Sequence, residues 1–114
     1  MSEHCLEDKS YKFAVRIVNL YKVLTDQRKE YVMSKQVLRS GTSIGANVSE
    51  AKYAHSKADF KAKLKIALKE ANETSYWLRL LHDTEYITDI EYENINNDIV
   101  ELIKILISIC KSIG

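Results

Sequence analysis

The chain has 114 residues, of which 46% are hydrophobic and 29% charged, with three glycines and no proline. This length fits one domain with one continuous core, and the composition favours a compact helical protein over a β-sandwich or a disordered tail. The formal net charge of +1 lacks the basic excess that is typical of strong nucleic-acid-binding domains. We therefore expect a single all-α domain over residues 1–114.

The sequence gives no sign of export or membrane insertion. No apolar run approaches the ~18 residues that cross a bilayer, and the first residues lack the basic and then apolar order of a secretion signal. We expect a cytoplasmic protein without membrane contact, in which Cys5, in a frayed terminus, and Cys110, on an apolar helix face, are reduced thiols. A bridge between them stays geometrically open if the chain ends meet.

Hydrophobic residues recur at helical spacing in four segments of the chain. The first predicted helix runs from about Lys9 to Thr25, and the second from about Glu30 to Tyr53. The polar residues between them form a connection short enough to fold the second helix back against the first.

Capping patterns mark the starts of the last two predicted helices. Ser56 with Asp59 forms a weak capping pattern, and Thr88 with Glu91 forms a full capping box. These helices are expected to end at about Asp83 and Ser112. Four helices with short connections predict an antiparallel up-down-up-down four-helix bundle.

The second predicted helix carries an unusual run of small and polar residues, from Arg39 to Ala51. Gly41 and Gly45 lie four residues apart inside it, and each costs a helix about 1 kcal/mol relative to alanine. Close approach of another helix at these positions would offset that cost. One stripe of the run is polar and the adjoining stripe, which includes Ile44, is apolar; the polar residues are Arg39, Ser43, Asn47 and Glu50.

Two interpretations of the polar stripe remain open. Its guanidinium, hydroxyl, amide and carboxylate groups could together recognise a polar ligand. Alternatively, the stripe faces a neighbouring helix or subunit, and Arg39 pairs with a carboxylate such as Glu70 or Glu73. Trp77, at the margin of the apolar face of the third helix, is either core filler or an interface anchor.

The fourth predicted helix has more apolar surface than one core requires. Val100, Ile105 and Ile107 lie outside its core stripe and widen the apolar arc to roughly 220°, against about 100° for an ordinary amphipathic helix. Such a surplus predicts a second contact, and self-association through these three residues is the simplest one. The alternative is a helix wedged deeply between the other three.

Four lysines at helical spacing form the candidate nucleic-acid contact, because they could neutralise several phosphates; they are Lys57, Lys61, Lys65 and Lys69. The alternative is a solvated face in which Lys69 pairs with Glu73. The chain is also unevenly charged, since residues 1–57 carry an excess of basic groups and residues 58–114 an excess of acidic groups. That polarity could orient a contact between subunits or with a phosphate backbone.

No pattern in the chain predicts catalysis or a cofactor. His4, His55 and His82 are far apart, and none belongs to a spacing that builds a metal site. There is no glycine-rich phosphate loop and no activated serine or cysteine elbow. We expect no catalytic residue, no metal and no cofactor.

The run from Arg39 to Ala51, together with Lys69–Leu78, resembles a family of bacterial four helix bundle proteins. The family was first named after proteins encoded in intervening sequences of 23S rRNA genes and is often labelled S23 ribosomal protein. The likeness covers nearly the whole chain. It implies an antiparallel four-helix bundle that assembles into a ring, pentameric in characterised relatives, without enzymatic activity.

The same superfamily includes the accessory variability protein of diversity-generating retroelements, which binds nucleic acid and a reverse transcriptase through a basic surface. The residues and the resemblance together predict a non-enzymatic, homo-oligomeric adaptor or scaffold. The alternative is a nucleic-acid-binding accessory protein that acts through its lysine-bearing helix face.

Overall fold

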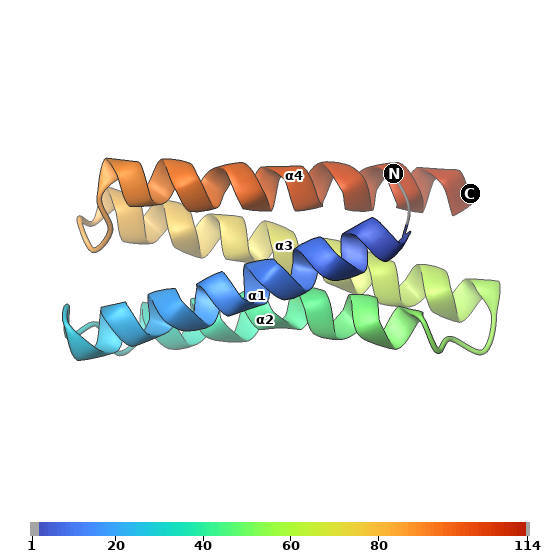
Figure 1. Ribbon diagram of the computed structural model, residues 1–114, viewed down its shortest axis with the longest axis horizontal. Coiled ribbons are helices and arrows are strands. Elements are labelled where there is room, and N and C mark those ends of the chain that lie inside the picture. The colour runs from blue at the N-terminus through green and yellow to red at the C-terminus, as the bar shows by residue number, and fades with distance from the viewer. Residues whose placement is uncertain (1–2, 114) are drawn as a thin grey trace.

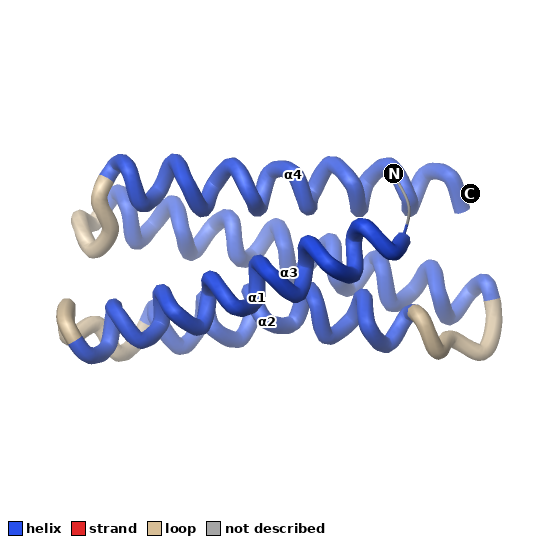
Figure 2. The backbone as a smooth tube through the Cα atoms, in the orientation of Figure 1, coloured by secondary structure: helices blue, strands red, loops and turns tan. Residues whose placement is uncertain are grey.

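The computed structural model describes residues 3–113, which form four α-helices: α1 (Glu3–Asp26), α2 (Met33–Ala51), α3 (Lys57–Asp83) and α4 (Asp89–Ile113). Successive helices run in opposite directions and are joined by short loops at the two ends of an elongated molecule (Figures 1 and 2). The predicted all-α antiparallel four-helix bundle is confirmed. Positions 1, 2 and 114 of the predicted domain, and the side chain of His4, lie outside the described residues.

The helices pack in a closed cycle in which α2 lies against α1 and α3, and α4 lies against α3 and α1. One core runs along the bundle and draws residues from all four helices. Its largest fully buried side chains include Leu6, Phe13, Ile17, Leu24, Val37, Ile44, Leu64, Leu78, Leu81, Ile99, Leu102 and Leu106. Ile44, a member of the predicted motif, is therefore a core residue.

The first helix begins earlier than its hydrophobic pattern predicts. It is helical from Glu3, because Leu6 is fully buried and Ser10 is 1% exposed, so both are packed rather than frayed. The expectation that Cys5 lies in a frayed terminus is therefore wrong. Cys5 and Cys110 are both half-buried, and no disulfide joins them within residues 3–113.

The second helix begins at Met33, three residues after the predicted start, because the Glu30 side chain caps it. Its carboxylate is 6% exposed and accepts hydrogen bonds from the backbone N–H groups of Val32, Met33 and Ser34 at 3.2, 3.0 and 2.6 Å. Burial raises the pKa of Glu30, but these backbone hydrogen bonds outweigh burial and hold the pKa below its ordinary value of 4.5.

The two predicted caps are confirmed. Ser56 accepts a hydrogen bond from the backbone N–H of Asp59 at 3.1 Å. In the box before α4, the Thr88 N–H donates to Glu91 at 2.8 Å and the Glu91 N–H donates to the Thr88 hydroxyl at 3.2 Å. Glu91 also accepts hydrogen bonds from both terminal nitrogens of Arg28, and these bonds lower the pKa of Glu91 to about 2.

The two glycines of α2 mark a close approach of α1. A Cβ atom on Gly41 would lie 2.8 Å from Cγ1 of Ile17, and one on Gly45 would lie 3.2 Å from the carbonyl oxygen of Ser10. The predicted close helix contact is therefore present, and α1 is the partner helix.

Replacing Glu30 with glutamine tests the cap of α2. We expect Glu30→Gln to lower the free energy of unfolding by about 1–2 kcal/mol at neutral pH, because a neutral amide is a weaker acceptor for three N–H groups. The folded-state pKa is depressed, so the wild-type advantage is present above the unfolded pKa and disappears as the pH falls through the folded value. Urea unfolding at several pH values measures the difference, and an equal difference at all pH values would contradict this assignment.

Candidate functional site

The polar stripe of α2 forms an ion-pair cluster with α3. Arg39 donates to the Glu70 carboxylate at 3.0 Å and to the Glu73 carboxylate, and the Trp77 indole N–H donates to the same Glu73 oxygen at 3.1 Å. The predicted pairing of Arg39 with Glu70 or Glu73 thus occurs with both carboxylates, within one chain. The Trp77 hydrogen bond is the main cause that lowers the pKa of Glu73, with burial opposing it and Arg39 adding to it.

The other polar residues of the stripe bond to their surroundings within the bundle. The Ser43 hydroxyl donates to the Arg39 carbonyl at 2.6 Å, and the Asn47 amide donates to the Ser43 carbonyl at 2.8 Å. Glu50 pairs with Lys63 of α3 at 3.4 Å. Ser43 and Asn47 therefore bond within α2, and Glu50 joins α2 to α3. Because these polar groups already have partners within the chain, the contacts support the packing interpretation over a ligand site.

A buried polar contact that the sequence analysis missed lies beneath this cluster. The Thr74 hydroxyl is 2.9 Å from the Ser40 hydroxyl and 2.8 Å from the Glu70 carbonyl, and both side chains are fully buried. The helical position of each residue places it toward the core, but only the register between α2 and α3 brings the two together.

Trp77 lies at the edge of the core. It is half-buried, packs against the core cluster and makes an edge-to-face contact with Tyr76, with ring centroids 5.2 Å apart. Tyr76 is itself 60% exposed. Trp77 therefore fills the margin of the α2–α3 contact and leaves part of its ring at the surface.

The four lysines of the predicted α3 stripe differ in exposure. Lys57, Lys65 and Lys69 are exposed and Lys61 is half-buried. The predicted Lys69–Glu73 ion pair does not form, because Glu73 pairs with Arg39 and Trp77 instead. Lys69 contributes only a longer-range Coulomb attraction that lowers the pKa of Glu73.

Two further exposed lysines, Lys104 and Lys111, lie on α4. At 100° per residue they share one side of that helix, roughly opposite the buried residues Ile95 and Leu102, so they point away from the bundle. The sequence analysis did not include them in the candidate contact, although their shared side of one helix was a signal in the sequence.

The exposed apolar surface of α4 is smaller than the sequence predicts. Ile105 is 4% exposed and belongs to the core, so the expectation that it contacts another subunit is corrected: the bundle itself covers it. Val100 and Ile107 remain 37% and 40% exposed. Part of the wide apolar arc therefore reflects a deeply seated helix, and part remains open.

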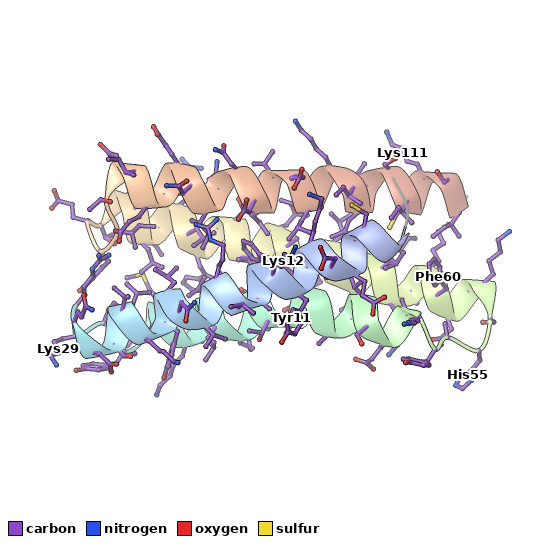
Figure 3. The ribbon with its side chains drawn as sticks, viewed as in Figure 1. Tyr11, Lys12, Lys29, His55, Phe60 and Lys111 are labelled. Carbon is purple, nitrogen blue, oxygen red and sulfur yellow. The ribbon has the colours of Figure 1, made fainter. Side chains whose placement is uncertain are left out.

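A second apolar surface, which the sequence analysis did not identify, lies on the outer side of α1 and α2. Tyr11, Val15 and Val18 are 70%, 45% and 36% exposed, and Figure 3 shows Tyr11 on α1 where that helix passes α2. Beside them is a groove of about 550 Å³, lined by Glu7, Asp8, Tyr11, Ala14, Thr42, Gly45, Ala46 and Ser49. The helical spacing of Tyr11, Val15 and Val18 is the sequence signal that could have revealed this surface.

His82 stacks on Tyr92 at 4.4 Å between centroids, and its hydrogen bond to Asp89 raises its pKa. Over residues 3–113, no three His, Cys, Asp or Glu side chains gather closely enough to hold a metal ion. None of the helices in this range combines the length and apolarity needed to cross a membrane.

The family follows from a match between residues 5–108 and the model of the 23S rRNA-intervening sequence protein family. The chain belongs to this family. A similar solved structure is a protein of unknown function from the S23 ribosomal protein family of Bacteroides thetaiotaomicron, with 66% identity and a TM-score of 0.95. The match covers 97% of this chain and 99% of that one. No curated protein is similar enough to be matched.

Proposed function

We propose that this member of the 23S rRNA-intervening sequence protein family is a non-enzymatic scaffold that works as a homo-oligomer. The observation that carries the proposal is exposed apolar surface on two sides of a bundle whose core is already complete. Tyr11, Val15 and Val18 lie on one side, and Val100 and Ile107 lie on the other. Clustered apolar side chains at a surface favour protein–protein contact, because burying them removes apolar area from water.

The ion-pair cluster of the motif supports a structural role for the most distinctive residues of the chain. Arg39, Glu70 and Glu73 pair with one another, and every fully buried side-chain nitrogen and oxygen of the described residues has a hydrogen-bond partner. The motif therefore fixes the register of α2 on α3 and presents no orphaned group to a substrate. The resemblance to ring-forming relatives adds the proposal that five copies assemble.

Light scattering after size exclusion tests self-association. We expect the wild-type protein to elute as an oligomer several times the 13.1 kDa mass of one chain. Ile107→Glu should shift it toward the monomer, because a buried contact would then hold an unpaired charge. Ser108→Glu is the matched control, since Ser108 is an exposed neighbour one step around α4. A monomeric wild-type protein would contradict the proposal.

A second candidate function is nucleic-acid binding through lysines of α3 and α4. The observation that favours it is that Lys57, Lys65 and Lys69 of α3 and Lys104 and Lys111 of α4 are exposed. Together these groups could neutralise several phosphates.

Titration of structured RNA and duplex DNA tests the second candidate. If it holds, binding weakens steeply between low and physiological salt, and Lys104→Glu/Lys111→Glu abolishes it. Lys22→Glu/Lys35→Glu is the control, because it makes the same change of charge at exposed positions on α1 and α2. Absence of binding by the wild-type protein at low salt would remove this candidate.

A further inference from the structure

We propose that a cavity at the end of the bundle that holds the chain termini binds a small apolar carboxylate, of the kind represented by a medium-chain fatty acid. The cavity, which we call the end cavity, has a volume of about 630 Å³. Small-molecule sites in proteins usually measure about 300–1,000 Å³ and are found between the helices of bundles, among other places. The residues that carry the proposed self-association do not line the end cavity, so the two proposals are independent.

The end cavity lies where the ends of all four helices meet. Leu6 of α1, Val48 of α2, Leu64 of α3 and Ile113 of α4 all line it. In Figure 1, α3 and α4 extend further than α1 at this end of the bundle. The outermost apolar residues of α3 and α4 therefore have less of α1 to pack against, and Phe60 and Ile113 are only half-buried. Unequal helix ends thus leave a hollow where the surrounding side chains are still apolar.

The walls of the end cavity are made mainly of apolar side chains. Leu6, Ala51 and Leu64 are 0%, 3% and 1% exposed, so they belong to the inner part of the cavity. Phe60 packs against the core while part of its ring stays open to solvent, and Figure 3 shows Phe60 at this end of the bundle. A molecule that covers these walls removes apolar area from water, which favours an apolar body.

The rim of the end cavity carries one lysine without a partner. Glu7 and Lys52 also line the cavity, but they pair with each other at 3.7 Å. The Lys57 ammonium is exposed and makes no ion pair or hydrogen bond with any residue in the range 3–113. Asp59, the next acidic residue along α3, accepts a hydrogen bond from the His55 backbone N–H at 3.3 Å and does not line the cavity. The side chains around the cavity therefore leave one net positive charge.

These features fit a ligand with an apolar body and one negative charge. The carboxylate accepts hydrogen bonds from the Lys57 ammonium, and the alkyl chain lies on the apolar walls. A neutral ligand leaves the lysine unpaired, and a strongly polar one places its polar groups on walls that cannot bond to them. All the lining residues on the helices lie within about two turns of a helix end, so the cavity accommodates a short chain rather than a partner helix.

Titration of the full chain with octanoate at neutral pH tests the site. We expect saturable shifts of backbone amide signals in NMR spectra, concentrated at the end of α2 and the start of α3, because both segments line the cavity. The alcohol 1-octanol has the same chain length without the charge. It should bind in the same place but more weakly, because it cannot form an ion pair with Lys57.

Two pairs of variants separate the charge from the walls. Lys57→Gln should weaken octanoate binding about two- to fivefold, as expected for a partly exposed ion pair, and leave 1-octanol binding unchanged. Lys65→Gln is its control, since Lys65 is exposed on the same helix and does not line the cavity. Ala54→Leu should weaken the binding of both probes, because Ala54 is half-buried in the cavity wall and the added methyl groups fill the space. Ala58→Leu, at an exposed position outside the cavity, should bind both probes normally.

Several outcomes would overturn the site. They are the absence of saturable shifts with octanoate, equal binding of octanoate and 1-octanol by the wild-type protein, and equal binding of octanoate by Lys57→Gln and Lys65→Gln. Unchanged binding of both probes by Ala54→Leu would also overturn it. Circular dichroism must show wild-type helicity for all four variants. Light scattering on the same samples reports self-association separately, so failure of either proposal is recognised independently of the other.

Discussion

The close approach of α1 to α2 at Gly41 and Gly45 is the constraint on which the arrangement of the bundle depends. Ile17 is fully buried and occupies the space that a side chain at position 41 would need, and the α1 backbone at Ser10 lies against Gly45. Each glycine weakens an isolated helix by about 1 kcal/mol relative to alanine, so the contacts between α1 and α2 must stabilise the bundle by more than this amount. α1 is thereby seated deeply on α2, whereas two partly exposed ion pairs, Arg16–Asp98 and Lys9–Glu101, join it to α4.

The same close contact shapes the outer surface of the molecule. Gly45 meets Ser10 on its inner side and lines the groove beside Tyr11 on its outer side. Because α1 uses Phe13 and Ile17 for the core, Tyr11, Val15 and Val18 are left facing outward. The ion-pair cluster of Arg39 holds α2 on α3 at the neighbouring seam. One helix, α2, therefore fixes the positions of both its neighbours and sets the surface through which we propose that copies meet.

Most of the fold was predictable from local patterns, because helical periodicity, the Ser56 cap and the Thr88 capping box depend on residues close in sequence. The start of α2 was misplaced since a glutamate three residues before a helix is an uncommon cap, recognisable only once the carboxylate of Glu30 is seen to be buried. The surfaces were less predictable. Whether Ile105 faces the core or solvent depends on the rotation of α4 within the bundle, which its own periodicity does not determine.

The measurement that tests the central constraint most directly is the stability of Gly41→Ala, alone and combined with Ile17→Ala. In an unconstrained helix the substitution would stabilise by about 1 kcal/mol. The structure predicts the opposite sign, a loss of about 1–3 kcal/mol, because the added methyl group meets Ile17. When Ile17 is already alanine, the loss should vanish. A Gly41→Ala protein at least as stable as the wild type in urea unfolding would contradict the account.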